Sequence, residues 1–310
     1  MDLLKVAVVG ANGFVGSHLT NKLIQIPNIK PFLFGKNKTH NFGNDITYQQ
    51  LDIKNEAEIR AYFSDIDIVY YLASETIPSS SWENPIIEIE KNLIPFLVFL
   101  ENIVKLRVKK IVFISSGGTI YGATEQKVTE DSFKNPFSPH GITKLTMEYF
   151  LNYFRKKYNL NFCIYRASNV YGAGQNTKKG IGIINTFLED ILSKNKITIF
   201  GDGSNIRNFL YVDDLIEIMV LPLFADIDQS NVFNVCSNDT LTINQLVEEI
   251  RKVVKQDFEV VYTKSRQSDN STIYLDNTRI LKANPGFQMT SLKDGILKTY
   301  LHIKKENNKL

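Results

Sequence analysis

Short apolar runs alternate with longer amphipathic stretches through the first half of the chain. The apolar runs lie at residues 5–9, 31–34, 67–72, 110–114 and 161–165. The stretches between them have the apolar spacing of helices. In the first run every residue from Val6 to Val9 is apolar, which is typical of a strand covered by helices on both faces. The pattern predicts an α/β fold with a Rossmann-type, doubly wound parallel sheet and this run at its centre.

A looser pattern follows Tyr171, with short strands at residues 197–200 and 232–235 and helices at residues 243–254 and 292–301. These elements predict a second, smaller mixed α/β domain. Residues 211–224 again have the pattern of a strand and a helix, so we expect the chain to return to the first domain there. We assign residues 1–170 and a return segment near 206–235 to the first domain, and residues 171–205 and 236–310 to the second.

Composition narrows the function classes. With 310 residues, 43% of them hydrophobic and 22% charged, the chain can fill two modest cores. The net charge of +3 is spread along the sequence, which argues against a nucleic-acid-binding stripe. Cys163 and Cys236 stand alone in apolar contexts, and no apolar run is long enough to span a membrane. We expect a cytoplasmic protein with no metal, nucleic-acid or membrane partner.

Three glycines mark the corner between the first predicted strand and the first helix. Gly10, Gly13 and Gly16 form a G-x-x-G-x-x-G turn. Glycine permits a tight turn and a close backbone approach there, so that free amides at the helix N-terminus can hold a pyrophosphate. We expect this turn to bind a dinucleotide through Gly10, Asn12, Gly13, Phe14, Val15 and Gly16.

The end of the second predicted strand carries no acid. NAD binders usually place Asp or Glu about twenty residues beyond the glycine turn, where it bonds the ribose hydroxyls. Here no carboxylate occurs between Gly16 and Asp45, and Lys36 and Lys38 follow the strand. This cationic corner favours the 2′-phosphate of NADP, with Lys36 as a contact, unless both lysines are ordinary solvated loop residues. We therefore expect NAD(P), with a preference for NADP.

Six motifs occur in a recognisable order. They are the glycine turn, Asp-Ile at 52–53, Leu-Ala-Ser at 72–74, Ser-Ser-Gly-Gly-Thr-Ile-Tyr-Gly at 115–122, Arg-Ala-Ser-Asn-Val-Tyr-Gly at 166–172 and Arg-Asn-Phe-Leu-Tyr-Val-Asp-Asp at 207–214. With these motifs the chain resembles the extended short-chain dehydrogenases/reductases, and most closely the nucleotide-sugar epimerases, dehydratases and 4-keto reductases. The resemblance implies hydride transfer at the C4 carbon of a nucleotide-linked sugar with NAD(P).

The resemblance also implies cofactor contacts after the third and fourth strands, at Asp52, Ile53, Leu72, Ala73 and Ser74. Asp52 allows two interpretations that its position does not separate. Its carboxylate can accept a hydrogen bond from the adenine amino group, or it can be the N-cap of a helix at residues 55–63.

The family's acid/base pair is Tyr-x-x-x-Lys on one helical face, and His140 and Lys144 occupy these two positions. The resemblance gives Lys144 the nicotinamide ribose as its partner. Imidazole, with a pKa of about 6.5 against about 10 for a phenol, can accept a proton near neutrality. The charge of Lys144 would disfavour the imidazolium, which is the form that must return the proton. The alternative is a degenerate site in which His140 caps or packs against a helix start.

A hydroxyl that positions the sugar is also expected from the resemblance. Gly117 occupies its usual position, so Ser116 or Thr119 is the substitute, unless Ser115 and Ser116 merely cap the strand-end loop. Asn169, Arg207 and Arg266 are the implied contacts of the substrate's nucleotide diphosphate, which the guanidinium fork suits.

Helices at residues 88–104 and 143–158 match those by which relatives form homodimers, although their apolar faces can instead cover only the sheet. The acid-free corner leads us to expect NADPH-dependent reduction of a 4-keto nucleotide sugar. A 4-epimerase that retains NAD is the alternative. A 4,6-dehydratase is disfavoured because Gly117 and Gly118 offer no carboxylate. A non-catalytic cofactor or nucleotide sensor is the remaining alternative.

Overall fold

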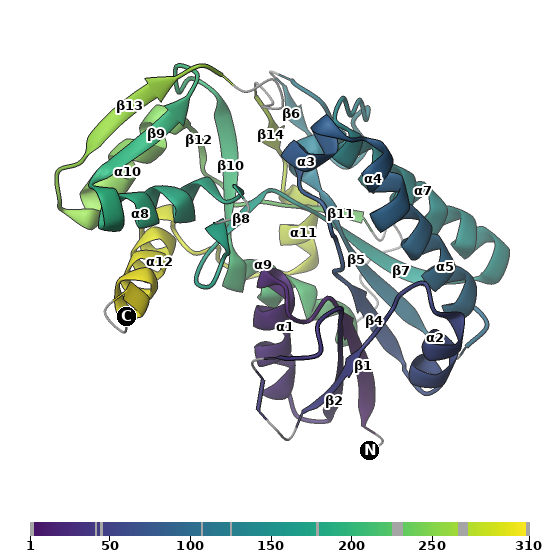
Figure 1. Ribbon diagram of the computed structural model, residues 1–310. Coiled ribbons are helices and arrows are strands. Elements are labelled where there is room, and N and C mark those ends of the chain that lie inside the picture. The colour runs from purple at the N-terminus through teal and green to yellow at the C-terminus, as the bar shows by residue number, and fades with distance from the viewer. Residues whose placement is uncertain are drawn as a thin grey trace. The chain divides into compact units, whose positions relative to one another are not determined.

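The computed structural model describes residues 3–40, 42–43, 46–106, 108–124, 126–177, 180–224, 232–265 and 272–307 (Figure 1). The chain divides into two compact units. The first comprises Met1–Ser116, Pro136–Arg166 and Ile216–Val232, and the second comprises Gly117–Asn135, Ala167–Leu215 and Phe233–Leu310.

A parallel sheet forms the centre of the first unit. Its strands are β1 (Leu4–Val9), β2 (Ile29–Gly35), β3 (Thr47–Gln50), β4 (Ile68–Tyr71), β5 (Lys110–Ser116) and β7 (Asn161–Ala167). The order is β7-β5-β4-β1-β2-β3, and β11 (Val232–Val235) adjoins β7 as the seventh strand. Strand β1 pairs in parallel with both β2 and β4, so the direction of winding changes at β1. The predicted doubly wound fold with a central first strand is confirmed.

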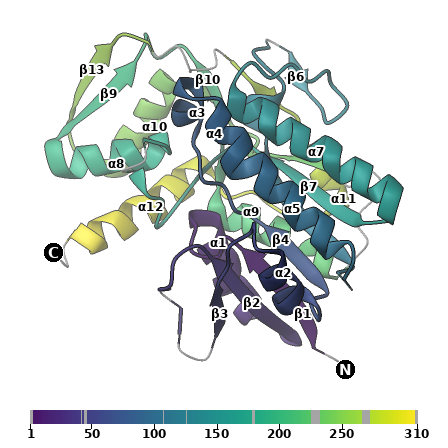
Figure 2. The ribbon, with the colours of Figure 1, turned by 45° about the vertical axis from the view of Figure 1, so that its right-hand side comes forward.

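The helices of the first unit are α1 (Phe14–Ile24), α2 (Glu56–Phe63), α3 (Pro78–Glu83), α4 (Ile86–Glu88), the π-helical turn η1 (Ile89–Leu93), α5 (Ile94–Ile103) and α7 (Pro139–Tyr158). Helix α9 spans Val212–Met219, and its part from Ile216 onward belongs to this unit. The 3-10 helix η3 (Leu221–Leu223) also belongs to it. Helices α4, η1 and α5 are continuous, and α5 and α7 lie side by side (Figure 2). In η1 the amide of Ile94 donates to the carbonyl of Ile89, five residues back, just before Pro95 removes the next amide from the helix.

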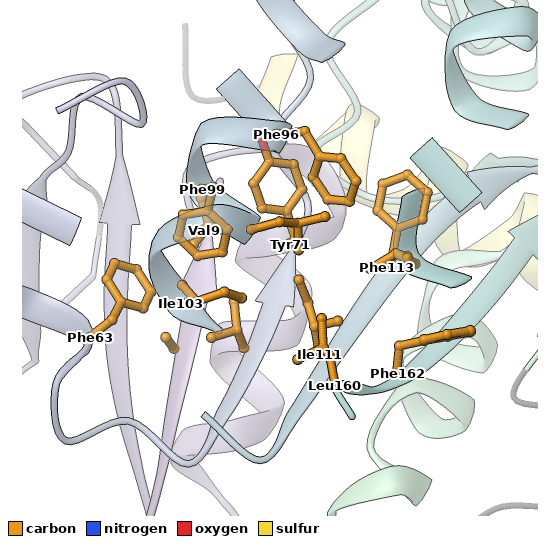
Figure 3. Packing of buried hydrophobic residues seen from close by; sticks show 14 of the residues in the cluster. Val9, Phe63, Tyr71, Phe96, Phe99, Ile103, Ile111, Phe113, Leu160 and Phe162 are labelled. Atoms are coloured by element: carbon orange, nitrogen blue, oxygen red, sulfur yellow. The ribbon is translucent and has the colours of Figure 1, made fainter. Parts of the chain in front are cut away.

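One face of the sheet is buried under α2, α5 and α7. Phe63 of α2 contacts Phe34 of β2 and Phe99 of α5, with ring centroids 4.6 and 5.1 Å apart. Phe96 of α5 links Tyr71 of β4 to the β5 residue Phe113 (Figure 3). Burying each such ring contributes roughly 1.5–3 kcal/mol, so this cluster fixes α5 and α7 against the strands whose carboxyl ends carry the site residues.

The second unit contains smaller sheets. Strand β10 (Ile206–Tyr211) pairs with β8 (Asn169–Tyr171) and β12 (Thr240–Thr242), β9 (Lys196–Phe200) pairs with β13 (Glu259–Thr263), and β14 (Tyr274–Leu275) pairs with β6 (Lys127–Val128). Its helices are α6 (Gly117–Ile120), α8 (Ile183–Lys194), α10 (Ile243–Val254), α11 (Thr278–Ala283) and α12 (Leu292–Asn307). Thr242 and Gln245 form a capping box at the start of α10, which explains why that helix begins where its apolar spacing begins. Across the described ranges no helix combines the length and apolarity needed to cross a lipid bilayer.

Candidate active site

The glycine turn after β1 is pressed against neighbouring backbone. Gly10 has φ +95°, and a Cβ on it would lie 2.9 Å from the amide nitrogen of Ala73 and 3.0 Å from the carbonyl carbon of Leu72. A Cβ on Gly16 would lie 2.2 Å from the carbonyl oxygen of Gly10. Larger residues are therefore excluded at both positions, and the turn lies directly beside the loop after β4.

The N-terminus of α1 lacks a side-chain cap. Its N-cap residue is Gly13, and its first turn contains no acid. The amides of Phe14, Val15 and Gly16, which have no partner within the helix by its geometry, are left for a ligand. The cradle left by the glycines and this uncapped helix end fit a dinucleotide pyrophosphate. Asn12 donates through Nδ2 to the carbonyl of Thr39 and to the Tyr48 hydroxyl, and its predicted cofactor contact stays a prediction.

Glu75 places an acid at the corner that the sequence suggested was cationic. Its carboxylate lies 2.9 Å from Lys36 Nζ, and both side chains are exposed. Exposed pairs contribute about 0–1 kcal/mol, so this one neutralises Lys36 without fixing it in place. Tyr48 also lies here, because a Cβ on Gly35 would be 2.5 Å from its hydroxyl. That hydroxyl donates to the carbonyl of Asn37, and burial raises the pKa of Tyr48 although the hydrogen bond from Asn12 lowers it.

Asp52 does not cap α2, so one of its two predicted roles is wrong. The cap is Asn55, whose side-chain oxygen accepts from the amides of Ala57 and Glu58. Asp52 instead accepts from the amide of Lys54 in a local turn, because its carboxylate is too far from the helix start along the chain. The adenine role of Asp52 stays a prediction. Ile53 is half-buried against the core, and Ser74 Oγ donates to the carbonyl of Thr76. The cofactor contacts predicted for these two residues also stay predictions.

His140 and Lys144 lie one turn apart at the start of α7. Ser138 is the N-cap of this helix and accepts from the amide of Gly141, so His140 is not the cap. Lys144 Nζ donates to the carbonyl of Ile114 at 3.0 Å and lies 4.8 Å from the centre of the Phe113 ring. Burial lowers the pKa of Lys144 to about 8, although the carboxylates of Glu88 and Glu148 raise it.

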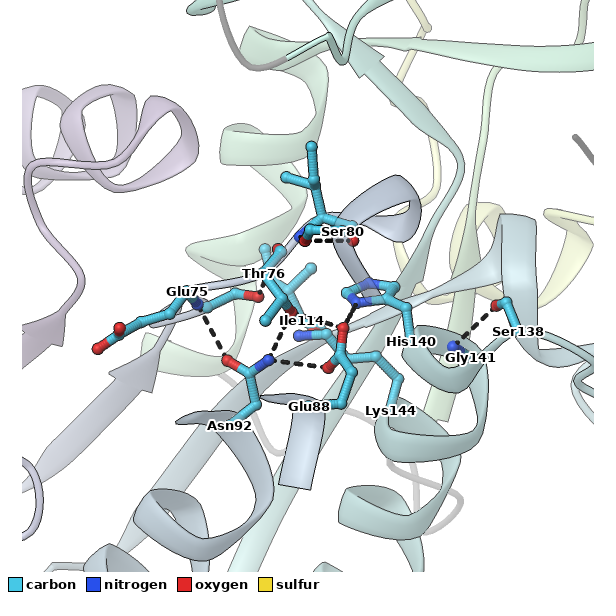
Figure 4. Close-up of polar contacts among 12 residues, drawn as sticks. Glu75, Thr76, Ser80, Glu88, Asn92, Ile114, Ser138, His140, Gly141 and Lys144 are labelled. Carbon is cyan, nitrogen blue, oxygen red and sulfur yellow. Dashed lines mark hydrogen bonds and ion pairs between the residues drawn. The ribbon is translucent and has the colours of Figure 1, made fainter. Parts of the chain in front are cut away.

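A carboxylate that the sequence reading did not identify contacts His140. Glu88 is 1% exposed, and its Oε1 lies 3.2 Å from His140 Nδ1 (Figure 4). Thr76 Oγ1 also donates to Oε1, at 2.5 Å, and Asn92 Nδ2 donates to Oε2 at 2.8 Å. Burial raises the pKa of Glu88, but the hydrogen bonds from His140, Thr76 and Asn92 more than offset this and hold it below its usual value. The carboxylate is therefore ionised.

Two buried hydroxyls near the end of β5 lack partners among the described residues. They are Ser115 Oγ at the end of the strand and Thr119 Oγ1 in α6. The alternative that Ser115 caps the strand-end loop is wrong, because its Oγ makes no such hydrogen bond. An unpaired buried hydroxyl costs about 1–3 kcal/mol, which a ligand hydroxyl can recover. The roles of Ser116, the last residue of β5, and of Thr119 stay predictions.

The predicted substrate contacts lie in the second unit. Asn169 in β8 donates through Nδ2 to the carbonyl of Asn208, and Arg207 in β10 donates through Nη1 to the carbonyl of Ile206. The parallel pairing of β8 with β10 places Asn169 opposite Phe209, two residues along from Arg207. Arg266 lies outside the described residues. All three assignments stay predictions.

Replacing Gly16 by Ala should weaken cofactor binding by roughly tenfold or more, which is 1.4 kcal/mol or more. The reason is that the added Cβ would displace the turn from Gly10. Calorimetric titration with NAD and with NADP measures the effect, and circular dichroism checks the fold. Gly43→Ala is the matched control, since nothing lies within 4 Å of its Cβ position. An unchanged Kd in Gly16→Ala would remove the turn from the binding site.

Lys144 should make the unfolding free energy rise with pH. Its folded-state pKa of about 8 lies below the usual 10.5, so the unfolded chain binds more protons between these values and stability increases through that window. Denaturant unfolding across it should show roughly 3 kcal/mol of this rise in the native chain. The rise should be absent in Lys144→Met and preserved in Lys156→Met, where an exposed lysine of the same helix is changed. Equal slopes in all three proteins would contradict the buried, destabilised ammonium.

Comparison with known proteins gives a consistent result along the whole chain. Residues 6–236 match the model of the NAD dependent epimerase/dehydratase family. The chain is 31% identical to a Methanocaldococcus jannaschii protein provisionally named UDP-glucose 4-epimerase, over 98% of this chain and 99% of that protein. It is 28% identical to the dTDP-4-dehydro-6-deoxyglucose reductase of Escherichia coli, over 96% and 97%.

The structural comparison agrees with the sequence matches. The UDP-glucose 4-epimerase of Thermotoga maritima, solved with UDP-glucose, superposes with a TM-score of 0.91 at 30% identity, and the match covers 98% of this chain and all of that one. The similarity therefore extends through both units.

Proposed function

The chain belongs to the NAD-dependent epimerase/dehydratase family, and we propose that it interconverts the C4 epimers of a UDP-linked sugar. The observation that carries the proposal is the His140–Lys144 pair at the start of α7, in the same unit as the uncapped glycine turn. Two similar proteins, from Methanocaldococcus jannaschii and Thermotoga maritima, bear the UDP-glucose 4-epimerase name. The glycine turn would hold a dinucleotide, whose nicotinamide ring would supply an acceptor for the hydride of the sugar C4 carbon and a donor for its return.

His140 takes the role that tyrosine has in the family's usual pair. Its ring accepts the proton of the sugar's C4 hydroxyl in the first half of the reaction and returns it in the second. Imidazole suits such a two-way transfer near neutral pH. Lys144, held by the carbonyl of Ile114, presents its ammonium to the nicotinamide ribose. Ser116 or Thr119 orients the sugar, and Asn169, Arg207 and Arg266 hold the nucleotide diphosphate.

We propose NAD as the cofactor. The preference for NADP depended on a free cation after β2, and Glu75 pairs with Lys36 there. The end of β2 lacks an acid of its own. Glu75, in the loop after β4, supplies one there. An epimerase oxidises and re-reduces one substrate with one retained dinucleotide, which NAD bound in place accomplishes.

Reduction of a 4-keto nucleotide sugar is the second candidate. One observation favours it: the described end of β2 still bears lysines and no carboxylate, and the Lys36–Glu75 pair is exposed enough for a 2′-phosphate to displace Glu75. The similarity to the Escherichia coli reductase is consistent with this reaction. A reductase consumes one NADPH per turnover, whereas an epimerase consumes none.

Purified protein incubated with UDP-glucose and NAD should form UDP-galactose, detected by proton NMR, without net NADH. His140→Ala should lower kcat by about 10²–10⁴-fold, because proton transfer to and from the C4 oxygen is lost. His302→Ala, on α12, is the control and should keep full activity. Turnover only of 4-keto sugars with NADPH would favour the reductase, and binding without any turnover would favour a sensor. Full activity in His140→Ala would reject His140 as the acid/base.

We also propose that the chain forms a homodimer through α4, η1, α5 and α7. The outer faces of these helices expose large apolar side chains, among them Ile86 at 62%, Ile89 at 48%, Ile94 at 44%, Tyr149 at 62% and Tyr153 at 47%. Side chains that only covered the sheet would point inward, as Phe96 and Phe99 do. Exposed apolar residues grouped on adjacent helices are typical of interfaces.

Tyr149→Asp should convert the dimer to a monomer at micromolar concentration, because it places a charge in the apolar face. Light scattering coupled to size exclusion measures the mass. Tyr262→Asp, at a comparably exposed tyrosine of β13, should leave the mass unchanged. A native chain that is already monomeric at these concentrations would refute the interface.

A further inference from the structure

Glu88 is a buried carboxylate surrounded by hydrogen-bond donors. Its two oxygens accept from Thr76 Oγ1, Asn92 Nδ2 and His140 Nδ1. A buried carboxylate without such partners would be strongly unfavourable. Thr76 and Asn92 are neutral donors, so His140 is the partner that can change charge (Figure 4). Glu88 therefore affects both the orientation and the protonation of the His140 ring.

The carboxylate is held rigidly by its own helix. Glu88 and Asn92 are four residues apart: Glu88 directly precedes the π-helical turn η1, and Asn92 lies within it. Asn92 is fixed in turn, because its Oδ1 accepts from the amide of Glu75 at 2.9 Å and its Nδ2 also donates to Thr76 Oγ1 at 2.6 Å. The position of Glu88 is thus set by the loop after β4, the same loop that contacts the glycine turn.

The contact with Glu88 selects one tautomer of His140. An ionised carboxylate only accepts hydrogen bonds, so the ring nitrogen facing it, Nδ1, carries a hydrogen. In the neutral ring the lone pair then belongs to Nε2. Nε2 is therefore the atom that can take a proton from a substrate hydroxyl.

The charges around His140 also balance. Lys144 lies one turn away on α7, and Glu148 on the same helix is paired with Arg166 of β7 at 2.6 Å. Glu88 is thus the negative charge that faces the ring and offsets Lys144. Other charged residues on the neighbouring elements are exposed: Glu83 on α3, and Glu90 and Lys91 on η1. The ammonium of Lys144 disfavours an imidazolium at His140, and the carboxylate of Glu88, 3.2 Å from the ring, opposes that effect.

We propose that Glu88 is a positioning residue for His140: it fixes the Nδ1–H tautomer, leaves Nε2 to exchange a proton with the sugar's C4 hydroxyl, and stabilises the imidazolium so that the proton can be returned. This inference rests on the proposed function. In the forward half-reaction the O4–H bond breaks and an Nε2–H bond forms, while the hydride of the C4 carbon would be taken by a dinucleotide held at the glycine turn. The return half-reaction reverses all three, so no external oxidant or reductant is needed.

Glu88→Gln tests the proposal, because the amide keeps an oxygen acceptor and loses the charge. Nitrogen-15 NMR of histidine-labelled protein, assigned with His140→Ala, should show the Nδ1–H tautomer in the native chain. In Glu88→Gln the imidazolium form should persist only to a lower pH than in the native chain. Glu90→Gln, an exposed change of the same kind two residues along, should leave the signals unchanged.

Kinetics give an independent readout. In Glu88→Gln kcat should fall about 10–100-fold with little change in KM, as for other residues that orient a reacting group. The acid limb of the kcat/KM profile should move to lower pH, because the neutral base survives further into acid when its carboxylate partner is gone. The double variant Glu88→Gln/Asn92→Asp restores a negative charge in the cluster and should return the acid limb part of the way.

The outcomes separate this proposal from the proposed function. If the native chain shows the tautomer and the imidazolium form persists only to a lower pH in Glu88→Gln, while no sugar is turned over, the pair stands and the epimerase assignment fails. If the native chain epimerises and Glu88→Gln leaves the tautomer, the titration and kcat unchanged, the positioning role is overturned. An acid limb that does not move at all in the folded double variant relative to Glu88→Gln also counts against the charge effect.

Discussion

Close contact between backbone segments at the first turn is the constraint on which the rest of the site depends. A Cβ at Gly10 or Gly16 would overlap neighbouring backbone, so the turn can lie against the loop after β4 only because both residues lack one. Because the carboxyl ends of parallel strands share one edge of the sheet, β1, β4 and β5 bring the uncapped helix end, Thr76 and the carbonyl of Ile114 to the same edge. Lys144 reaches that edge from α7.

The same edge contains a buried polar cluster, which an apolar core would normally exclude. Its members satisfy one another: Glu88 accepts from Thr76, Asn92 and His140, and Asn92 accepts from the amide of Glu75. Such a cluster is stable when every donor and acceptor is matched, and it holds each side chain in one orientation. His140 is therefore part of an ordered hydrogen-bond network.

Much of the fold followed from local pattern. Apolar spacing located the core strands and predicted α10 at its observed bounds, because Thr242 caps the helix at the residue before the spacing starts. Other boundaries depended on competition between neighbours. Helix α12 continues to Asn307, beyond the expected end, and α2 takes its cap from Asn55 although Asp52 was an equally suitable residue type. A cap requires the correct backbone geometry, which residue type alone does not reveal.

The sequence by itself determined the glycine turn and the His140–Lys144 pair, because both follow from local geometry: the absence of a Cβ, and the 3.6-residue period of a helix. Only the tertiary structure decided which charges act on them. Glu88 precedes His140 by 52 residues and Glu75 follows Lys36 by 39, so neither contact has a local sequence signal. Each exists because the order of strands in the sheet brings the ends of separate segments together.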